Sequence, residues 1–459
     1  MNENLLDKDL ARIFENAFPN TLDTTVRWHV DGFEDSSRWK RSKKSNEPWA
    51  GAQSFIVTGD INAEWLRDST NQLAQYQRLA KKDKRIENLI LGAINTQAEY
   101  VIQNPYCNAF QPPPPSVLAP TSNGQTDEVR PAYEPSFVFE CKWELDSLAA
   151  FLKLGNEFYE QTGNSDFMSK RWFMALGRLL ETLNAQSQPT FDQETGLFRR
   201  NEYTFTRETR AGTETLALNG NGHPLNHGTG LIRSAFRPSD DASILGFFIP
   251  ANAMMAVELQ RTGAILKKTG HKTLGDEIGT RGKNLEKAVW EHGVVTHKTH
   301  GQVFAYEVDG YGGQILMDDA NIPSLLSLPY LGFTTSTNPT YLNTRRMILS
   351  AQGNPYYLAG RDFAGIGGPH IGLENAWPMS VLMQAMTSDD DAEILACLER
   401  VKNVSRLGLL HESVNVQNGR EYTRSWFAWA NSVFAQTVLD LAERKPALLF
   451  GEGKDAYIV

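Results

Sequence analysis

Apolar residues recur every three or four positions over most of the chain, a period that is typical of amphipathic α-helices. The first such segment covers residues 8–18, and Gly163 is a suitable helix stop. The segments that follow fall into pairs, and each pair predicts a helical hairpin: 68–80 with 85–103, 144–163 with 165–186, 240–270 with 273–293, 321–332 with 341–352, and 372–388 with 389–404. A last helix over 422–444 can pair with the first, so roughly twelve helices are expected.

Strand-like segments are short and lie between the predicted hairpins, at residues 54–60, 196–205 and 303–310. Helices that repeat in pairs, joined by long loops, predict an all-α toroid with an inner and an outer ring and a functional site at its mouth. No strict sequence repeat accompanies the pattern. The proline run 112–115 is typical of a surface loop, and no linker divides the chain. We therefore expect one domain over residues 1–459.

The composition narrows the possible partners. The net charge of -9 argues against nucleic acid, because binding phosphates requires a basic face. The N-terminal segment lacks the basic start and apolar stretch of a signal peptide. No apolar run is long enough to span a bilayer, so no membrane partner is expected and the compartment stays open. The ten tryptophans suit either a large core or a cleft that stacks sugars.

The three cysteines are Cys107, Cys141 and Cys397. None belongs to a closely spaced pair, which argues against a structural zinc site and against a disulfide scaffold. One pair can still form a disulfide, and the spacing leaves open which.

The stretch TGDINAEWLRDSTNQL carries a dense group of carboxyl side chains. The strand-like run before it favours a turn near Asp60 over one helix face through Asp60, Glu64 and Asp68. One interpretation is a helix N-terminus stabilised by its acids, with Arg67 in a structural salt bridge. The other is a sugar-binding shelf, in which Trp65 stacks on a ring while Arg67 and Asp68 bind hydroxyl groups. A hard-cation site ranks third, because Arg67 would oppose a cation.

The stretch FRPSDDASILGFFIP, residues 236–250, places Asp240 next to Asp241. Ser239 is a favourable N-cap, which puts both acids in the first turn of a helix, and ordinary capping is the structural interpretation. The functional interpretation is a carboxyl group at the mouth of the toroid. Two like charges close together raise one of the two pKa values, as a general acid requires.

Three further polar groups lie before predicted helices. Glu412 follows His411 in a predicted loop, which fits a sugar hydrolase, whereas the structural alternative is a surface glutamate. The helix after it is expected to begin with Tyr422, Arg424, Trp426 and Trp429. His370 lies at a glycine-rich turn; a lone histidine is more often structural, and the spacing of a phosphate-binding loop is missing. Paired acids at a predicted helix start recur at Asp318 and Asp319.

In these segments the chain resembles glycoside hydrolase family 125, the exo-acting α-1,6-mannosidases. The resemblance runs from about Asn20 to about Arg444. It is carried by motifs that occur in the same order: TGDINAEWLRDSTNQL, NPYCNAF, KWELDSLAAFL, FRPSDDA, LMDDANIPSLLSLPYLG, GIGGPH, WPMSVLMQA, LLHES and YTRSWFAWANSVF. An ordered series of motifs is far more specific than any one of them.

The resemblance implies an (α/α)6 barrel and an inverting hydrolysis of terminal α-1,6-linked mannose, with no metal or other cofactor. It places the general acid on Asp240 or Asp241, with a slight preference for Asp240, and the general base on Glu412. An inverting pair is expected to lie about 6.5–9.5 Å apart. The expected partner is a mannose-containing oligosaccharide or glycan. Candidates for holding its mannose are Trp65, Arg67 and Asp68, and more weakly Asp319, His370 and Arg424.

Three alternatives are kept beside this hypothesis. The first is another inverting toroid hydrolase, such as an α-glucosidase. The second is a sugar-binding protein that has lost its acid or base, which the presence of both motifs disfavours. The third is an epimerase or phosphorylase, which would need a histidine pair or phosphate dependence. The loops around residues 112–115 and 367–379 depart from the shorter bacterial pattern of the family and are expected to line the leaving-group subsites.

Overall fold

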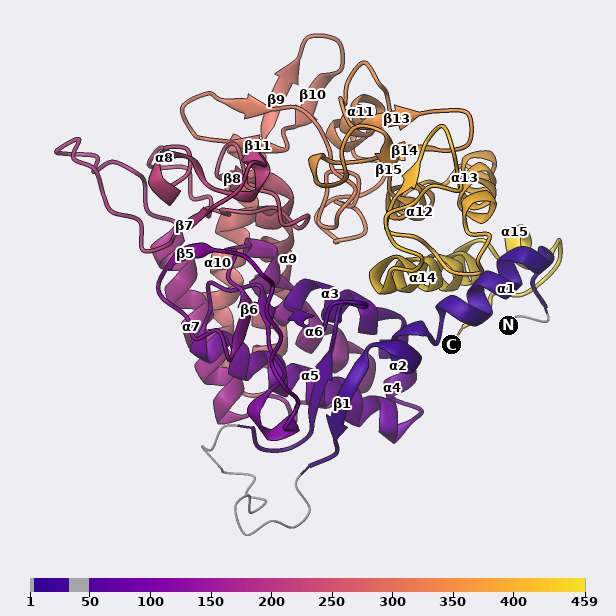
Figure 1. Cartoon of the computed structure of the whole chain (residues 1–459), viewed down its shortest axis with the longest axis horizontal. Helices are drawn as coiled ribbons and strands as arrows, with labels where there is room; N and C mark the ends of the chain where they lie inside the picture. Colours follow the sequence, from indigo (N-terminus) through magenta and orange to yellow (C-terminus); the bar gives the residue numbers. More distant parts are fainter. Residues whose placement is uncertain (1–3, 33–48, 459) are drawn as a thin grey trace.

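Helices make up most of the regular structure of the computed structural model, which describes residues 4–32 and 49–458 (Figure 1). The single domain predicted over 1–459 also includes residues 1–3, 33–48 and 459, which lie outside the described part. The helices are α1 (Lys8–Ala17), α2 (Asn20–Thr24), α3 (Leu66–Leu73), α4 (Gln77–Ala80), α5 (Lys84–Gln103), α6 (Leu145–Thr162), α7 (Lys170–Gln186), α8 (Ala217–Gly220), α9 (Ile249–Lys268), α10 (Lys272–His292), α11 (Pro339–Ile348), α12 (Pro378–Met386), α13 (Asp391–Val404), α14 (Ala428–Arg444) and α15 (Pro446–Phe450).

Most of the predicted helical hairpins are present. Helix α6 ends at Gly163, whose φ of 69° is left-handed, as the sequence predicts for a helix stop. The hairpin of α9 and α10 is held by close backbone approach, because a Cβ on Gly263 would lie 2.6 Å from the carbonyl oxygen of Gly275. Helices α12 and α13 form another hairpin. The arrangement is of the α/α type, as predicted.

The first and last long helices of the chain, α1 and α14, lie side by side, as their apolar patterns predict (Figure 1). Helix α14 also packs against α3 and α12. The contact between α1 and α14 joins the two ends of the chain. The contact between α14 and α3 brings the loop before residue 66 close to the loop before residue 428.

The strands are short and lie in loops between helices. They are β1 (Val26–Val30), β2 (Gln53–Ile56), β3 (Glu64–Trp65), β4 (Ala109–Phe110), β5 (Asp127–Arg130), β6 (Val138–Glu140), β7 (Thr204–Arg207), β8 (Phe247–Phe248), β9 (Val294–His297), β10 (Gly301–Phe304), β11 (Glu307–Val308), β12 (Gln314–Ile315), β13 (Tyr357–Ala359), β14 (Ala364–Ile366), β15 (Asn375–Ala376) and β16 (Val414–Asn415). The order β3-β4-β6 forms one small sheet, β12-β11-β8 a second, and β15 pairs with β16. Each predicted strand-like segment is therefore only partly a strand.

Several predicted helices are wrong in whole or in part. Helix α9 begins at Ile249 rather than at Asp240, because the carboxylate of Glu307 accepts hydrogen bonds from the backbone N–H groups of residues 244 and 245 and β11 pairs with β8. Residues 321–332 form turns instead of a helix, because Pro323 and Pro329 lack the N–H groups that a helix interior needs. Asp318 satisfies two of the free N–H groups there, at 2.8 and 2.9 Å.

The last helix begins later than expected. Helix α14 starts at Ala428, so Tyr422, Arg424 and Trp426 precede it in a loop instead of forming its first turn. Within that loop the N–H of Thr423 bonds to Ser413, and the N–H of Phe427 bonds to Leu410. The loop is thereby tied back to the segment that carries Glu412.

One continuous set of buried apolar side chains runs from Leu5 to Phe450. Several tryptophans belong to it, and the fully buried ones include Trp143, Trp172, Trp377 and Trp429. These tryptophans serve the core, one of the two roles that composition alone leaves open. Among the described helices, none has the length and apolar character that crossing a membrane requires.

Candidate active site

The two adjacent acids at residues 240 and 241 lie in a tight turn and point to different surroundings. The N–H of Asp240 bonds to the carbonyl of Arg237, and the N–H of Arg237 bonds to the carbonyl of Asp241. Asp240 has a φ of 65°, a left-handed conformation that aspartate tolerates better than most residues and that recurs at functional sites. The helix-capping interpretation is therefore wrong for this stretch, because no helix begins here.

The side chain of Asp240 is partly exposed and is held by two donors. Its Oδ1 accepts from the indole Nε1 of Trp65 at 3.1 Å and from Nδ2 of Asn108 at 2.9 Å. Burial would raise the pKa of Asp240, but the nearby cations Lys142 and Arg67 hold it below its ordinary value. Asp241 is almost fully buried and accepts from Ser239 at 2.8 Å, and burial raises its pKa.

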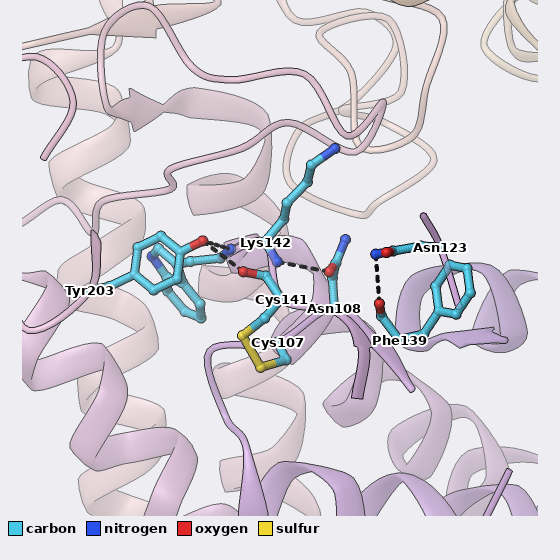
Figure 2. Close-up of a disulfide and its surroundings, with 8 residues drawn as sticks. Cys107, Asn108, Asn123, Phe139, Cys141, Lys142 and Tyr203 are labelled. Carbon is cyan, nitrogen blue, oxygen red and sulfur yellow. Dashed lines mark hydrogen bonds between the residues drawn. A yellow bond between two sulfur atoms is a disulfide. The ribbon is translucent and has the colours of Figure 1, made fainter. Parts of the chain in front are cut away.

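The donors to Asp240 come from the small sheet β3-β4-β6. Trp65 ends β3, and Asn108 directly precedes β4. Figure 2 shows the disulfide between Cys107 and Cys141, with an S–S distance of 1.99 Å, beside this sheet. Cys397 is a free, buried cysteine. The structure thus answers which pair of cysteines is joined, a question that the spacing leaves open.

The disulfide fixes the chain on either side of the Asn108 amide. The backbone N–H of Lys142 donates to Oδ1 of Asn108 at 3.0 Å (Figure 2). Because Oδ1 is the acceptor here, the amide must present Nδ2 to Asp240 and to Glu144, which accept at 2.9 and 3.1 Å. Tyr203 supports the same segment, since its hydroxyl donates to the carbonyl of Cys141 at 2.9 Å.

Arg67 lies at the centre of a buried ion cluster. Its guanidinium contacts Glu144 at 2.6 Å, Asp68 at 3.1 Å and Asp146 at 3.2 Å, and it lies over the ring of Trp429 at 5.4 Å. The predicted structural salt bridge is therefore confirmed. Burial raises the pKa of Asp68 to about 7 and that of Asp146 to about 6, although Arg67 opposes both shifts. The side chain of Arg67 is 2% exposed, so contact with a sugar stays a prediction.

The other residues of the segment 58–73 either pair with the loop that carries Arg424 or are buried in the protein. A turn occurs near Asp60, as predicted, and Asp60 pairs with Arg424. Glu64 is buried, accepts from the N–H of Ile56 at 3.1 Å and has a pKa raised to about 8 by burial. Trp65 is 6% exposed and packs edge-on against Phe139, so its contact in this structure is with Asp240 and the core. Stacking of Trp65 on a sugar ring remains a prediction.

Glu412 lies just before β16 and is held by the loop that precedes α14. Its Oε2 accepts from the hydroxyl of Thr423 at 2.8 Å, and its Oε1 lies 3.3 Å from Nε of Arg424. His411 stacks on Tyr422 with ring centroids 3.8 Å apart, and its Nδ1 lies 2.8 Å from the carbonyl oxygen of Arg424. These contacts tie the carboxylate to a fixed loop and leave its edge on an open cleft.

That cleft has a volume of about 650 Å³. Its lining residues are Asp60, His370, Ile371, Glu412, Thr423, Arg424, Ser425 and Trp426. The charge of His370 also acts on the other acids, because it lowers the pKa of Asp240 and opposes the rise in the pKa of Asp241. One histidine thus lines the Glu412 cleft and influences both adjacent acids.

Asp319 lies next to this histidine's loop. A Cβ on Gly368 would lie 2.5 Å from Oδ2 of Asp319, so the glycine lets the loop approach this carboxyl group closely. Oδ1 of Asp319 accepts from the N–H and the side-chain amide of Asn321, whereas the buried Oδ2 has no protein partner. Burial, reinforced by Asp241, raises the pKa of Asp319 to about 6.

The structure adds site residues that the sequence did not single out, namely Asn108, Lys142, Glu144 and Thr423. All four lie in motifs that carry the family resemblance: Thr423 in YTRSWFAWANSVF, Asn108 in NPYCNAF, and Lys142 and Glu144 in KWELDSLAAFL. For Asn108, Lys142 and Glu144 the signal was proximity to the paired cysteines, which became readable only once the disulfide was known. Within residues 4–32 and 49–458, no three His, Cys, Asp or Glu side chains are grouped so as to hold a metal ion.

Known proteins resemble the chain over almost its whole length. A protein of Schizosaccharomyces pombe, the meiotically up-regulated gene 157 protein, is 54% identical over 450 residues, which cover 98% of this chain and 85% of that protein. A solved Streptococcus pneumoniae structure is described as a metal-independent α-mannosidase in a non-productive substrate complex with α-1,6-mannobiose. It has a TM-score of 0.81 and 30% sequence identity, and the match covers 94% of this chain and 93% of that chain.

A more distant structure shares the fold alone. It is a family 78 rhamnosidase of Bacillus sp. GL1, with a TM-score of 0.55 and 12% identity over 96% of this chain and 35% of that chain. Residues 7–439 match the family described as metal-independent α-mannosidases, and this range contains Asp240, Asp241 and Glu412. The chain therefore belongs to glycoside hydrolase family 125, the metal-independent α-mannosidases, as the order of its motifs predicts.

Proposed function

We propose that this protein is an exo-acting, inverting α-1,6-mannosidase, built as one (α/α)6 barrel domain over residues 1–459. The family and the mannobiose complex of the Streptococcus pneumoniae relative support the substrate class. The observation that carries the proposal is that the segment 58–73 contacts Asp240 directly and reaches Glu412 through Arg424. Asp60 pairs with Arg424 beside Glu412, while Trp65 donates to Asp240. The backbone from Asp60 to Trp65 spans at most about 18 Å, which supports placing both carboxyl groups in one site.

In this proposal Asp240 is the general acid and Glu412 the general base. Asp240 is preferred over Asp241 because it is the more exposed of the two and faces the segment that also borders the cleft. Asp240 protonates the glycosidic oxygen while Glu412 takes a proton from the water that attacks C1 from the opposite face. The carboxyl groups are expected to lie about 6.5–9.5 Å apart, which leaves room for the water.

The mannose is proposed to lie between the Asp240 turn and the Glu412 loop. Arg424 and His370 line this cleft and are suited to bind hydroxyl groups. Asp319 presents a buried oxygen with no protein partner near Asp241, which suits a hydroxyl donor from the sugar. Trp65, Arg67 and Asp68 form the floor on the acid side, and a closed floor favours exo action on a terminal sugar.

A substrate panel tests this function. The protein should hydrolyse α-1,6-mannobiose much faster than the α-1,2 and α-1,3 isomers, and p-nitrophenyl α-mannoside faster than the corresponding glucoside. Preference for the glucoside would favour the α-glucosidase alternative. Binding of every mannobiose with zero turnover would favour a sugar-binding protein. Activity should survive EDTA, and a loss that calcium restores would contradict the metal-free mechanism.

A further inference from the structure

Glu144 lies behind Asp240 and has no part in the reaction scheme above. It precedes the first residue of α6, is 1% exposed, and makes no backbone cap there. Its Oε2 accepts from Arg67 at 2.6 Å and from Ser147 at 3.0 Å. Its Oε1 accepts from Nδ2 of Asn108 at 3.1 Å, the same nitrogen that donates to Asp240 at 2.9 Å. One amide therefore holds the two carboxyl groups together.

Because one nitrogen, Nδ2 of Asn108, donates to both, the carboxyl groups of Glu144 and Asp240 are immediate neighbours in the same buried cluster. Two ionised carboxylates at such a separation repel, whereas one proton between them turns the repulsion into a hydrogen bond. The side-chain amide of Asn108 only donates hydrogen bonds to the two carboxyl groups. The proton between the pair must therefore belong to one of the two carboxyl groups themselves.

The surrounding charges also favour a retained proton. Six buried or partly buried carboxyl groups face three cations, so full ionisation would leave three negative charges uncompensated in a site with little solvent. Other charged or titratable groups near the pair are His370 and Tyr203. The members of this group are Asp68, Asp127, Glu140, Glu144, Asp146 and Asp240, with Arg67, Lys142 and Arg207.

We infer that Glu144 is a positioning residue for the general acid: it shares one proton with Asp240 and keeps this carboxyl pair singly protonated in the working enzyme. The inference rests on the proposed function, because it takes Asp240 as the acid. The pKa shifts favour Glu144 as the holder of the shared proton, because Lys142 and Arg67 keep the pKa of Asp240 below its ordinary value. Burial, reinforced by Asp240, raises the pKa of Glu144 well above its ordinary value in spite of Arg67.

The shared proton fits the chemistry without an added reagent. The shared proton moves from Glu144 to Asp240, and Asp240 passes it to the glycosidic oxygen as the bond from C1 to that oxygen breaks, so that the electron pair stays with the leaving oxygen. Water adds to C1 and Glu412 takes one of its protons. Asp240 and Glu144 are then both ionised, and the pair regains one proton from solvent while Glu412 releases its own.

The pH profile of Glu144→Gln tests this role. The substrate is whichever α-linked mannobiose the wild type hydrolyses fastest. The alkaline limb of kcat/KM should move down by at least about one pH unit, because a glutamine holds Asp240 as an ionised acceptor with no proton to share. Activity at neutral pH should fall by about tenfold or more. On 2,4-dinitrophenyl α-mannoside, whose leaving group needs no proton, the loss should stay under about threefold.

Two further variants separate proton sharing from general damage to the cluster. Asp146→Asn removes another carboxylate from Arg67 but does not touch Asp240, and should move the alkaline limb by less than about half a unit. Asn108→Leu removes the N–H that stabilises both ionised carboxylates, and should move the limb upward, opposite to Glu144→Gln. If Glu144→Gln does not fold, the direction of the Asn108→Leu shift decides.

The results that would disprove the role of Glu144 differ from those that would disprove the proposed function. Three results would each overturn the role of Glu144. The alkaline limb stays in place in Glu144→Gln, or it moves equally in Asp146→Asn. The third is a limb that stays in place or moves downward in Asn108→Leu. Linkage preference and the anomer of the product judge the proposed function instead. An enzyme that prefers another mannosidic linkage would disprove that function while still giving the pH comparison its readout.

Discussion

The two sides of the candidate site use similar residues in opposite settings. On the acid side, Arg67 is 2% exposed and shares its charge among buried carboxyl groups. On the base side, Arg424 is 27% exposed and pairs with Asp60 and Glu412 at the edge of an open cleft. Burial raises the pKa values of Asp68, Glu144 and Asp146 around Arg67, so protons are retained behind Asp240, whereas Arg424 pairs with carboxyl groups that line the cleft. The acid side therefore holds protons close to Asp240, where the proposed general acid needs them.

Replacing the base should have the largest effect. Glu412→Gln removes the group proposed to take a proton from water, so kcat on α-1,6-mannobiose should fall by about 10³-fold or more. Mannobiose affinity, measured by calorimetry, should stay within about threefold of the wild type. Glu421→Gln, on an exposed residue of the same loop region, is the matched control. A fall of less than about tenfold would remove Glu412 from the catalytic role.

The two arginines should differ in what they do for stability. Arg67→Met leaves three buried carboxyl groups without their cation and should lower the free energy of unfolding by about 3–5 kcal/mol. Arg424→Met breaks partly solvated pairs and should cost about 1 kcal/mol or less. Urea unfolding at neutral pH measures both. Equal losses would mean that burial does not separate the two sides.

The adjacent acids should separate by their dependence on the leaving group. Asp240→Asn should lower kcat/KM on mannobiose by about 100-fold and have little effect on 2,4-dinitrophenyl α-mannoside. Asp241→Asn should affect both substrates alike, because its carboxyl group is buried and bonded to Ser239. The reverse pattern would assign the acid to Asp241.

Asp68→Asn should have the smallest effect, with two readouts. Mannose affinity should fall by about tenfold, because the floor of the acid side loses a carboxylate. The pH dependence of stability should also flatten. The folded protein holds the Asp68 proton to about pH 7 and an unfolded aspartate releases it near pH 4, so the free energy of unfolding falls as the pH rises between these values. The asparagine variant lacks this decline.

An unchanged affinity and an unchanged rate for Asp68→Asn would reduce the segment 58–73 to a structural helix start. Urea unfolding at pH 5 and pH 7.5 provides the stability comparison. A decline that is as steep in the variant as in the wild type would assign the proton uptake to other buried acids, such as Asp146 and Asp319.

The helical hairpins were predictable from the sequence because their apolar period and stops are local signals, as at Gly163. The helix predicted over 321–332 failed for a local reason, the prolines at 323 and 329, whereas the other failures depend on tertiary contacts. Asp240 leaves the predicted helix because Glu307, far along the chain, binds the N–H groups that follow it. The burial of Arg67 and the proximity of Glu144 to Asp240 likewise arise from packing between segments, which no local pattern encodes. The motif order located the candidate acid and base, whereas Asn108, Lys142, Glu144 and Thr423 required the structure.

The anomer of the first-formed product tests the central claim most directly. Proton NMR of α-1,6-mannobiose during its first minutes of digestion distinguishes the two anomers before they equilibrate. An acid and a base that act on opposite faces of the sugar, with water between the base and C1, release β-mannose. Release of α-mannose would contradict the account, because it would require a covalent intermediate and a retaining mechanism.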